Sequence, residues 1–180
     1  MMETYLALLR GINVGGKNKI SMADLAAIFV EVGCVAPRTY IQSGNVIFEA
    51  APETAVLVPA AVSTAIATHF GFQSPVVSRT ASEIDAVVRD VPFPVDGVDE
   101  TTLHVSFLAA TPTADRVAAL DPQKFAPDLF VVHGRTIYLQ LPQGMARTKL
   151  TNAYFDRALA TISTVRNWRT VIALRALMEH

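Results

Sequence analysis

The alternation of apolar and polar positions in the first forty residues predicts a strand, a long loop and a helix. The apolar run Tyr5 to Leu9 is typical of a buried strand. A polar, glycine-rich loop follows over residues 10–19. Ser21 and Asp24 have the spacing of a helix N-cap and its capping-box partner, and Gly33 suits a left-handed C-cap. Between these ends, one apolar helix face is predicted from the spacing of Leu25, Ile28, Phe29 and Val32.

A hairpin and a second helix are predicted next. Residues 38–42 and 46–49 flank Ser43-Gly44-Asn45, whose Gly and Asn tolerate the positive φ of a tight turn. Pro59 can open a helix that Gly71 closes, with Val62, Ile66 and Phe70 on one face. An edge strand is expected over Pro75 to Ser78. A capping box at Thr80–Glu83 then starts a short helix that ends near Arg89.

The same order of elements recurs in the second half of the chain. A strand is predicted over 103–108, a helix over 111–120, a hairpin of strands 129–132 and 136–141 around His133-Gly134-Arg135, and a helix over 148–159. Leu150, Tyr154 and Ala158 are expected on one side of that helix. A last helix begins near Asn167 and carries Val171, Leu174 and Met178 inward.

Strand–helix–strand–strand–helix thus appears twice, which predicts an α+β protein of two ferredoxin-like (βαββα) units in tandem, with mixed sheets and helices on one face of each sheet. The Pro- and acid-rich stretch 91–100 reads as the linker. We therefore expect a first unit over 1–90, and a second unit with the C-terminal helix over 91–180.

This topology predicts a site. In a βαβ unit the first strand runs up, its helix runs down and the second strand runs up again, so the loop 10–19 and the turn 43–45 lie at the same edge of the sheet. Polar residues from both segments are then neighbours, and we expect them to bind a ligand: Arg10, Asn13, Lys17, Asn18, Lys19, Gln42, Ser43 and Asn45.

The chemistry of the loop favours an anion, because glycines let backbone amides approach a ligand closely and a helix start follows. The alternative is a plain strand-to-helix connection that uses glycine for turning. Gly11 to Lys17 also nearly matches the phosphate loop of nucleoside triphosphatases. However, Asn18 replaces the hydroxyl residue that would hold Mg²⁺, and the predicted helix starts several residues late.

The composition restricts the classes of protein to which this chain can belong. Apolar residues make up 51% of 180 and charged residues 17%, enough for a packed core. The single cysteine, Cys34, excludes an internal disulfide and a cysteine-cluster metal site, and is expected to be buried. No apolar run reaches the roughly 18 residues of a membrane helix, and the start lacks a basic signal region. These features favour the cytoplasm.

The sequence shows no clear pattern for a metal site or for a catalytic nucleophile. The four histidines show no metal-ligand spacing, so no metal site is predicted, and Ser43 is not surrounded by a nucleophile elbow. The sequence leaves the cofactor, the catalytic residues and any reaction unspecified.

A second basic region lies near the C-terminus. From Met145 to Arg175 there are six basic residues and one acid, although the net charge of the chain is −1. A second ligand site could be formed there by Arg147, Lys149, Asn152, Arg166, Asn167 and Trp168. The alternatives are a solvated charged face and, for Trp168, a position in the core.

Four segments together point to a family. LRGINVGGKNK (9–19), YIQSGNVIF (40–48), KLTNAYF (149–155) and RNWRTV (166–171) resemble the bacterial family catalogued as domain of unknown function 1697. The resemblance implies tandem ferredoxin-like units and no established activity, substrate or cofactor. It places these residues in the signature segments of the family: Arg10, Gly11, Asn13, Gly15, Gly16, Asn18, Gln42, Ser43, Gly44, Asn45, Lys149, Asn152, Asn167 and Trp168.

Three functions remain open. The first is binding of a phosphorylated or carboxylated small molecule at the loop and hairpin. The second is a nucleic-acid-binding module, suggested by the basic C-terminal region and Trp168. The third is a ligand-free scaffold or oligomer-forming protein, suggested by the edge strand near Val76.

Overall fold

The computed structural model describes residues 1–179 and divides the chain into two compact units. Unit 1 comprises residues 1–84 and the chain end from Leu174, and unit 2 comprises residues 85–173. The division falls inside two helices, α4 (Ala81–Arg89) and α7 (Trp168–Met178), and not in the stretch 91–100 where the sequence places the linker.

Each unit contains a four-stranded sheet with the same strand order. In unit 1 the order is β2-β3-β1-β4, from strands β1 (Glu3–Leu9), β2 (Val35–Tyr40), β3 (Asn45–Ala50) and β4 (Val76–Thr80). In unit 2 it is β6-β7-β5-β8, from β5 (Leu103–Leu108), β6 (Leu129–His133), β7 (Thr136–Gln140) and β8 (Ser163–Asn167). The corresponding strands occupy corresponding places, so the tandem ferredoxin-like fold is confirmed.

All neighbouring strands in the described sheets are antiparallel, where mixed sheets were predicted. β1 and β2 do run in the same direction, as a βαβ crossover requires, but β3 lies between them. The hairpin partner therefore supplies the antiparallel ladder, and no parallel pair forms.

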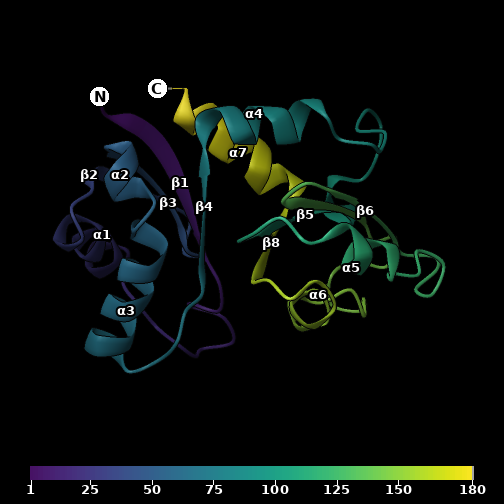
Figure 1. Cartoon of the computed structure of the whole chain (residues 1–180), viewed down its shortest axis with the longest axis horizontal. Coiled ribbons are helices and arrows are strands. Elements are labelled where there is room, and N and C mark those ends of the chain that lie inside the picture. Colours follow the sequence, from purple (N-terminus) through teal and green to yellow (C-terminus); the bar gives the residue numbers. More distant parts are fainter. Residues whose placement is uncertain (180) are drawn as a thin grey trace. The chain divides into compact units, whose positions relative to one another are not determined.

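Helices α1 (Met22–Glu31) and α3 (Val58–Phe70) lie on the same side of the first sheet (Figure 1). A short helix, α2 (Pro52–Ala55), precedes α3 and was not predicted. Ser21 caps α1 by accepting a hydrogen bond from the Asp24 amide, as predicted. The amides of Gly33 and Cys34 bond back to Val30 and Phe29, which closes α1 in a Schellman motif.

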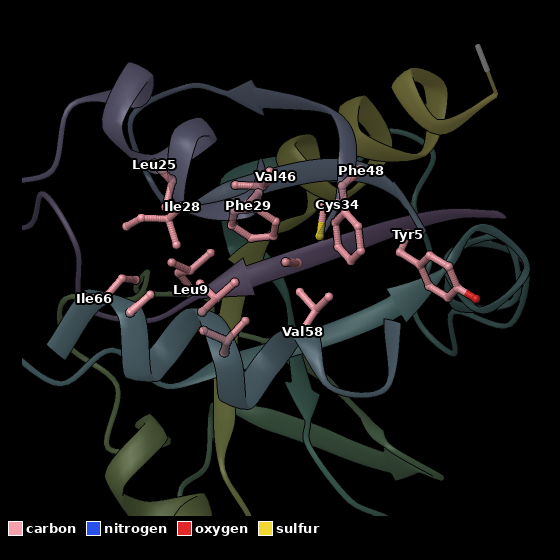
Figure 2. Packing of buried hydrophobic residues seen from close by; sticks show 14 of the residues in the cluster. Tyr5, Leu9, Leu25, Ile28, Phe29, Cys34, Val46, Phe48, Val58 and Ile66 are labelled. Atoms are coloured by element: carbon pink, nitrogen blue, oxygen red, sulfur yellow. The ribbon is translucent and has the colours of Figure 1, made fainter. Parts of the chain in front are cut away.

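The core of unit 1 lies between these helices and the sheet (Figure 2). Phe48 of β3 stacks on Tyr5 of β1, with ring centroids 5.6 Å apart, and contacts Phe29 of α1 at 5.4 Å. The predicted apolar faces are confirmed: Leu25, Ile28 and Phe29 are buried from α1, and Val62 and Ile66 from α3.

Unit 2 has a similar core under shorter helices. It contains the 3₁₀ turn η1 (Glu100–Thr102), α5 (Ala114–Ala118) and α6 (Asn152–Leu159). α5 begins after its cap Thr113, and α6 begins after its cap Thr151, so both are shorter than predicted. Within α6, Phe155 and Leu159 are buried, while Tyr154 is half-buried. The predicted side therefore packs against the core of unit 2 at Leu150 and Tyr154, and the buried positions Phe155 and Leu159 lie next to it.

The last strand and helix complete the fold. The sequence pattern predicted no strand at Ser163–Asn167, although β8 pairs with β5 along its whole length. The final helix begins at Trp168, one residue after the predicted start. It buries the three expected side chains: Val171, Leu174 and Met178.

Candidate functional site at the loop and hairpin of unit 1

The loop after β1 and the turn between β2 and β3 lie together. Leu8 pairs with Asn45 in the sheet, and the Leu9 amide donates a 2.8 Å hydrogen bond to the Gly44 carbonyl. A Cβ atom placed on Gly44 would lie only 2.9 Å from the Leu9 Cβ atom. The two segments therefore meet at one sheet edge, as the predicted topology requires, and the turn accepts only glycine at its closest point.

The two loop asparagines that were predicted to bind a ligand also hold the loop through side-chain hydrogen bonds. Asn13 uses both ends of its amide on Ile20: Nδ2 donates to the Ile20 carbonyl at 3.0 Å, and Oδ1 accepts from the Ile20 amide at 2.9 Å. Asn18 Nδ2 donates to the Gly11 carbonyl at 2.9 Å. Both residues have positive φ, near 53° and 52°, a conformation that asparagine tolerates better than most residues. Their side-chain amides thus connect the two ends of the loop, Asn13 to Ile20 and Asn18 to Gly11.

At the tip of the loop, two glycines form a tight reversal. The Lys17 amide donates to the Val14 carbonyl at 3.0 Å, and the intervening Gly15 and Gly16 have φ of 58° and 73°, typical of a type I′ turn. Helix α1 begins only at Met22. In the phosphate loop of nucleoside triphosphatases the glycine turn leads directly into a helix, and this loop does not.

The hairpin contributes one structural amide and two accessible side chains. Asn45 is fully buried, and its Nδ2 donates to the Tyr40 carbonyl and to Ser43 Oγ. Gln42 is exposed and Ser43 is half-buried. Arg10 is tied through its backbone, because its amide donates to Pro75 and its carbonyl accepts from the buried Ser74 hydroxyl.

The accessible polar groups at this edge are therefore fewer than the sequence suggested. Lys17, Lys19 and Gln42 are exposed, and Arg10 and Ser43 are half-buried. Residues 10–19 contain three cations and no acid, so the edge carries a local positive potential in a chain whose net charge is −1.

The second predicted set of basic residues does not form one cluster. Asn152, at the start of α6, accepts a hydrogen bond from the Ser163 hydroxyl at the beginning of β8, whereas Asn167 ends that strand. Four residues of strand span roughly 13 Å, and Figure 1 shows α6 and α7 at opposite ends of β8. Asn152 and Asn167 therefore belong to different ends of unit 2.

Residues 166–168 have structural roles. Arg166 donates to the Thr164 hydroxyl at 2.9 Å and to the Val165 carbonyl at 2.8 Å, and burial lowers the pKa of its guanidinium to about 10. Asn167 caps α7 by accepting from the Thr170 amide, and Trp168 is buried. Trp168, which suggested a surface for unstacked bases, is thus a core residue, and the half-buried Arg166 is hydrogen-bonded within its own strand.

Lys149 instead lines a surface pocket of unit 2, together with side chains that the sequence did not assign to a site. The pocket is lined by Lys124, Phe125, Thr151, Ala153, Tyr154 and Arg157 as well as Lys149. A partial signal was present in the sequence, since residues 153 and 157 are spaced four apart on one face of α6. The contribution of residues 124 and 125 comes from a distant loop and left no such signal.

A family model described as "Protein of unknown function (DUF1697)" matches residues 2–138. The chain belongs to this family. The match to DUF1697 includes the loop 9–19 and the hairpin 40–48, and it ends before the segments 149–155 and 166–171.

The solved structure of the conserved bacterial protein SP0830 from Streptococcus pneumoniae shares the fold of this DUF1697 protein. The TM-score is 0.75 over 99% of both chains, with 23% sequence identity. No curated protein matches the chain. Among the described residues, no helix is long and apolar enough to cross a membrane, and no group of three histidine, cysteine or acidic side chains could hold a metal ion.

Proposed function

We propose that this protein binds a small phosphorylated or carboxylated molecule at the loop and hairpin edge of unit 1. The observation that supports this function most is a pre-formed cationic loop. Asn13 and Asn18 fix the backbone of residues 11–20 by side-chain hydrogen bonds, and the fixed loop presents Lys17 and Lys19 at an exposed tip.

A rigid loop favours binding because a ligand then loses little affinity to the ordering of the protein. The exposed tip turns on Gly15 and Gly16, and the absence of side chains there lets an anion approach the backbone amides. Lys17 and Lys19 would supply the charge, with Gln42 and Ser43 of the hairpin as neutral donors. The ligand on this proposal is a compact anion, bound at a surface edge.

The test uses the distribution of lysines, since the chain contains only four: Lys17, Lys19, Lys124 and Lys149. We would record ¹H–¹⁵N spectra of the whole protein during titration with sodium phosphate and, separately, sodium citrate, at constant ionic strength. Saturable shifts are expected in the amides of residues 14–19. The double variant Lys17→Ala/Lys19→Ala should lose them.

The matched control is Lys124→Ala/Lys149→Ala, which removes the same charge elsewhere and should keep the shifts. Non-saturating shifts in the native protein, or equal shifts in both double variants, would show that the loop is only a connection between strand and helix.

A further inference from the structure

We propose that the pocket at the start of α6 in unit 2 binds an organic phosphate with a planar ring, of the nucleoside monophosphate class. The pocket has a volume of about 320 Å³, at the lower end of the range for small-molecule sites. Its lining combines three cations with two aromatic rings and the residue that caps a helix. This site is separate from the loop of unit 1 and does not depend on the function proposed there.

Three cationic side chains support the proposal that the ligand contains a phosphate group. Lys124, Lys149 and Arg157 are all exposed, and no acidic side chain lines the pocket. Three carboxylates lie close in sequence to these cations without lining the pocket, and one of them, Asp121, accepts a hydrogen bond from the Gln123 amide. Asp128 accepts a 2.7 Å hydrogen bond from Thr148, and Asp156 accepts from both the amide and the hydroxyl of Ser163. Three positive charges thus surround one concave surface without a lining counter-charge, which favours a multiply charged anion.

The start of α6 lies on the same side of the pocket. The Thr151 hydroxyl accepts from the Tyr154 amide at 3.2 Å, and the Thr151 carbonyl accepts from Phe155. Ala153, in the first turn, lines the pocket. The amide end of a helix carries a partial positive charge, so it supplements the three side-chain cations.

Two aromatic side chains support the proposal that the ligand contains a planar ring. Phe125 and Tyr154 meet edge to face, with centroids 5.0 Å apart, and Tyr154 makes a second such contact with Phe155 at 5.2 Å. The Lys124 ammonium lies 5.5 Å from the centroid of the Phe125 ring. Phe125 and Tyr154 are half-buried against the core of unit 2, so their positions are fixed while part of each ring remains in the pocket wall. Fixed aromatic surface beside cations suits a base or similar ring joined to a phosphate.

The experiment compares adenosine 5′-monophosphate, ribose 5-phosphate and adenosine as probes, by calorimetric titration of the whole protein. Adenosine 5′-monophosphate should bind more tightly than either fragment, because each fragment keeps only the phosphate or only the ring. The double variant Lys124→Ala/Lys149→Ala should weaken its binding about 10-fold or more. The variant Tyr154→Leu should reduce the preference for the nucleotide over ribose 5-phosphate.

The control is Lys17→Ala/Lys19→Ala, which removes the lysines of the unit 1 loop and should keep the ring-dependent nucleotide binding that Lys124→Ala/Lys149→Ala loses. Circular dichroism of each variant shows whether it is folded. Binding of adenosine 5′-monophosphate that is equal in the two lysine double variants would overturn the site. Equal affinity for ribose 5-phosphate and the nucleotide would contradict the proposed contact with a planar ring. No binding of adenosine 5′-monophosphate at about 10 mM would contradict both the phosphate part and the ring part of the proposal.

Discussion

The Leu9 amide donates to the Gly44 carbonyl at 2.8 Å, and this contact brings the loop after β1 against the β2–β3 turn. Gly44 has φ of 73°, and an added Cβ atom would lie 2.9 Å from Leu9 Cβ and 3.0 Å from the Leu9 carbonyl oxygen. The contact therefore requires both a left-handed backbone and the absence of a side chain.

We expect Gly44→Ala to lower the free energy of unfolding by about 2 to 4 kcal/mol, because the positive φ and the overlap with Leu9 both act against alanine. Urea unfolding measures the change. The matched variant is Gly16→Ala, since Gly16 has the same φ and no heavy atom within 4 Å of an added Cβ. It should lose only about 1 to 2 kcal/mol. Equal losses in the two variants would contradict the close approach.

Asn13 is expected to matter more for stability than Asn18. Asn13→Ala removes two hydrogen bonds to Ile20 in a half-buried place, whereas Asn18→Ala removes one exposed bond to Gly11. The positive φ is nearly the same at both positions, 53° and 52°. We expect a loss of about 2 to 3 kcal/mol at Asn13 and about 1 kcal/mol at Asn18. Thermal unfolding of the two variants decides the order. The further variant Asn13→Gly separates the loss of the side-chain hydrogen bonds from the effect of the positive φ.

His104 should make stability depend on pH. Burial lowers the pKa of its imidazole, and its Nδ1 atom has no hydrogen-bond partner among the described residues. Because the unfolded chain then binds the proton more readily, stability is fully present above the unfolded pKa of about 6.5 and is lost as pH falls through the folded pKa.

The variant His104→Leu should remove this part of the acid-side loss. It should also leave stability at pH 8 nearly unchanged, because it removes an unsatisfied buried polar atom. Urea midpoints from pH 8 to pH 5 test the prediction, with the exposed His133→Ala as the comparison variant. An unchanged pH dependence in His104→Leu would contradict it.

Cys34 should be unreactive in the folded protein. Its side chain is buried, and burial raises the pKa of the thiol to about 11. At pH 8 the thiolate that attacks alkylating reagents is then scarce as well as shielded. Iodoacetamide labelling followed by mass spectrometry should be slow in buffer and fast in denaturant. The chain has one cysteine, so the signal is unambiguous, and rapid labelling without denaturant would show that this part of the core opens.

The comparison of β4 with β8 shows where local pattern was insufficient. The sequence over 75–78 predicted a strand in unit 1, but Ser163-Thr164-Val165-Arg166-Asn167 has one aliphatic residue and predicted none. Pairing with β5, from Leu108 opposite Ser163 to His104 opposite Asn167, makes this segment a strand. Tertiary pairing thus overrides a weak local propensity.

The sequence by itself determined the order of most elements, the helix ends at Ser21, Gly33 and Gly71, and the meeting of the loop with the hairpin. These follow from local rules: side-chain periodicity, capping and the direction of a crossover. Only the tertiary structure decided that Asn13, Asn18 and Asn45 hold the backbone, and that Lys124 and Lys149 line one pocket. An amide can donate to a ligand or to its own chain, and the choice depends on which carbonyls folding brings within about 3 Å, which sequence spacing does not specify.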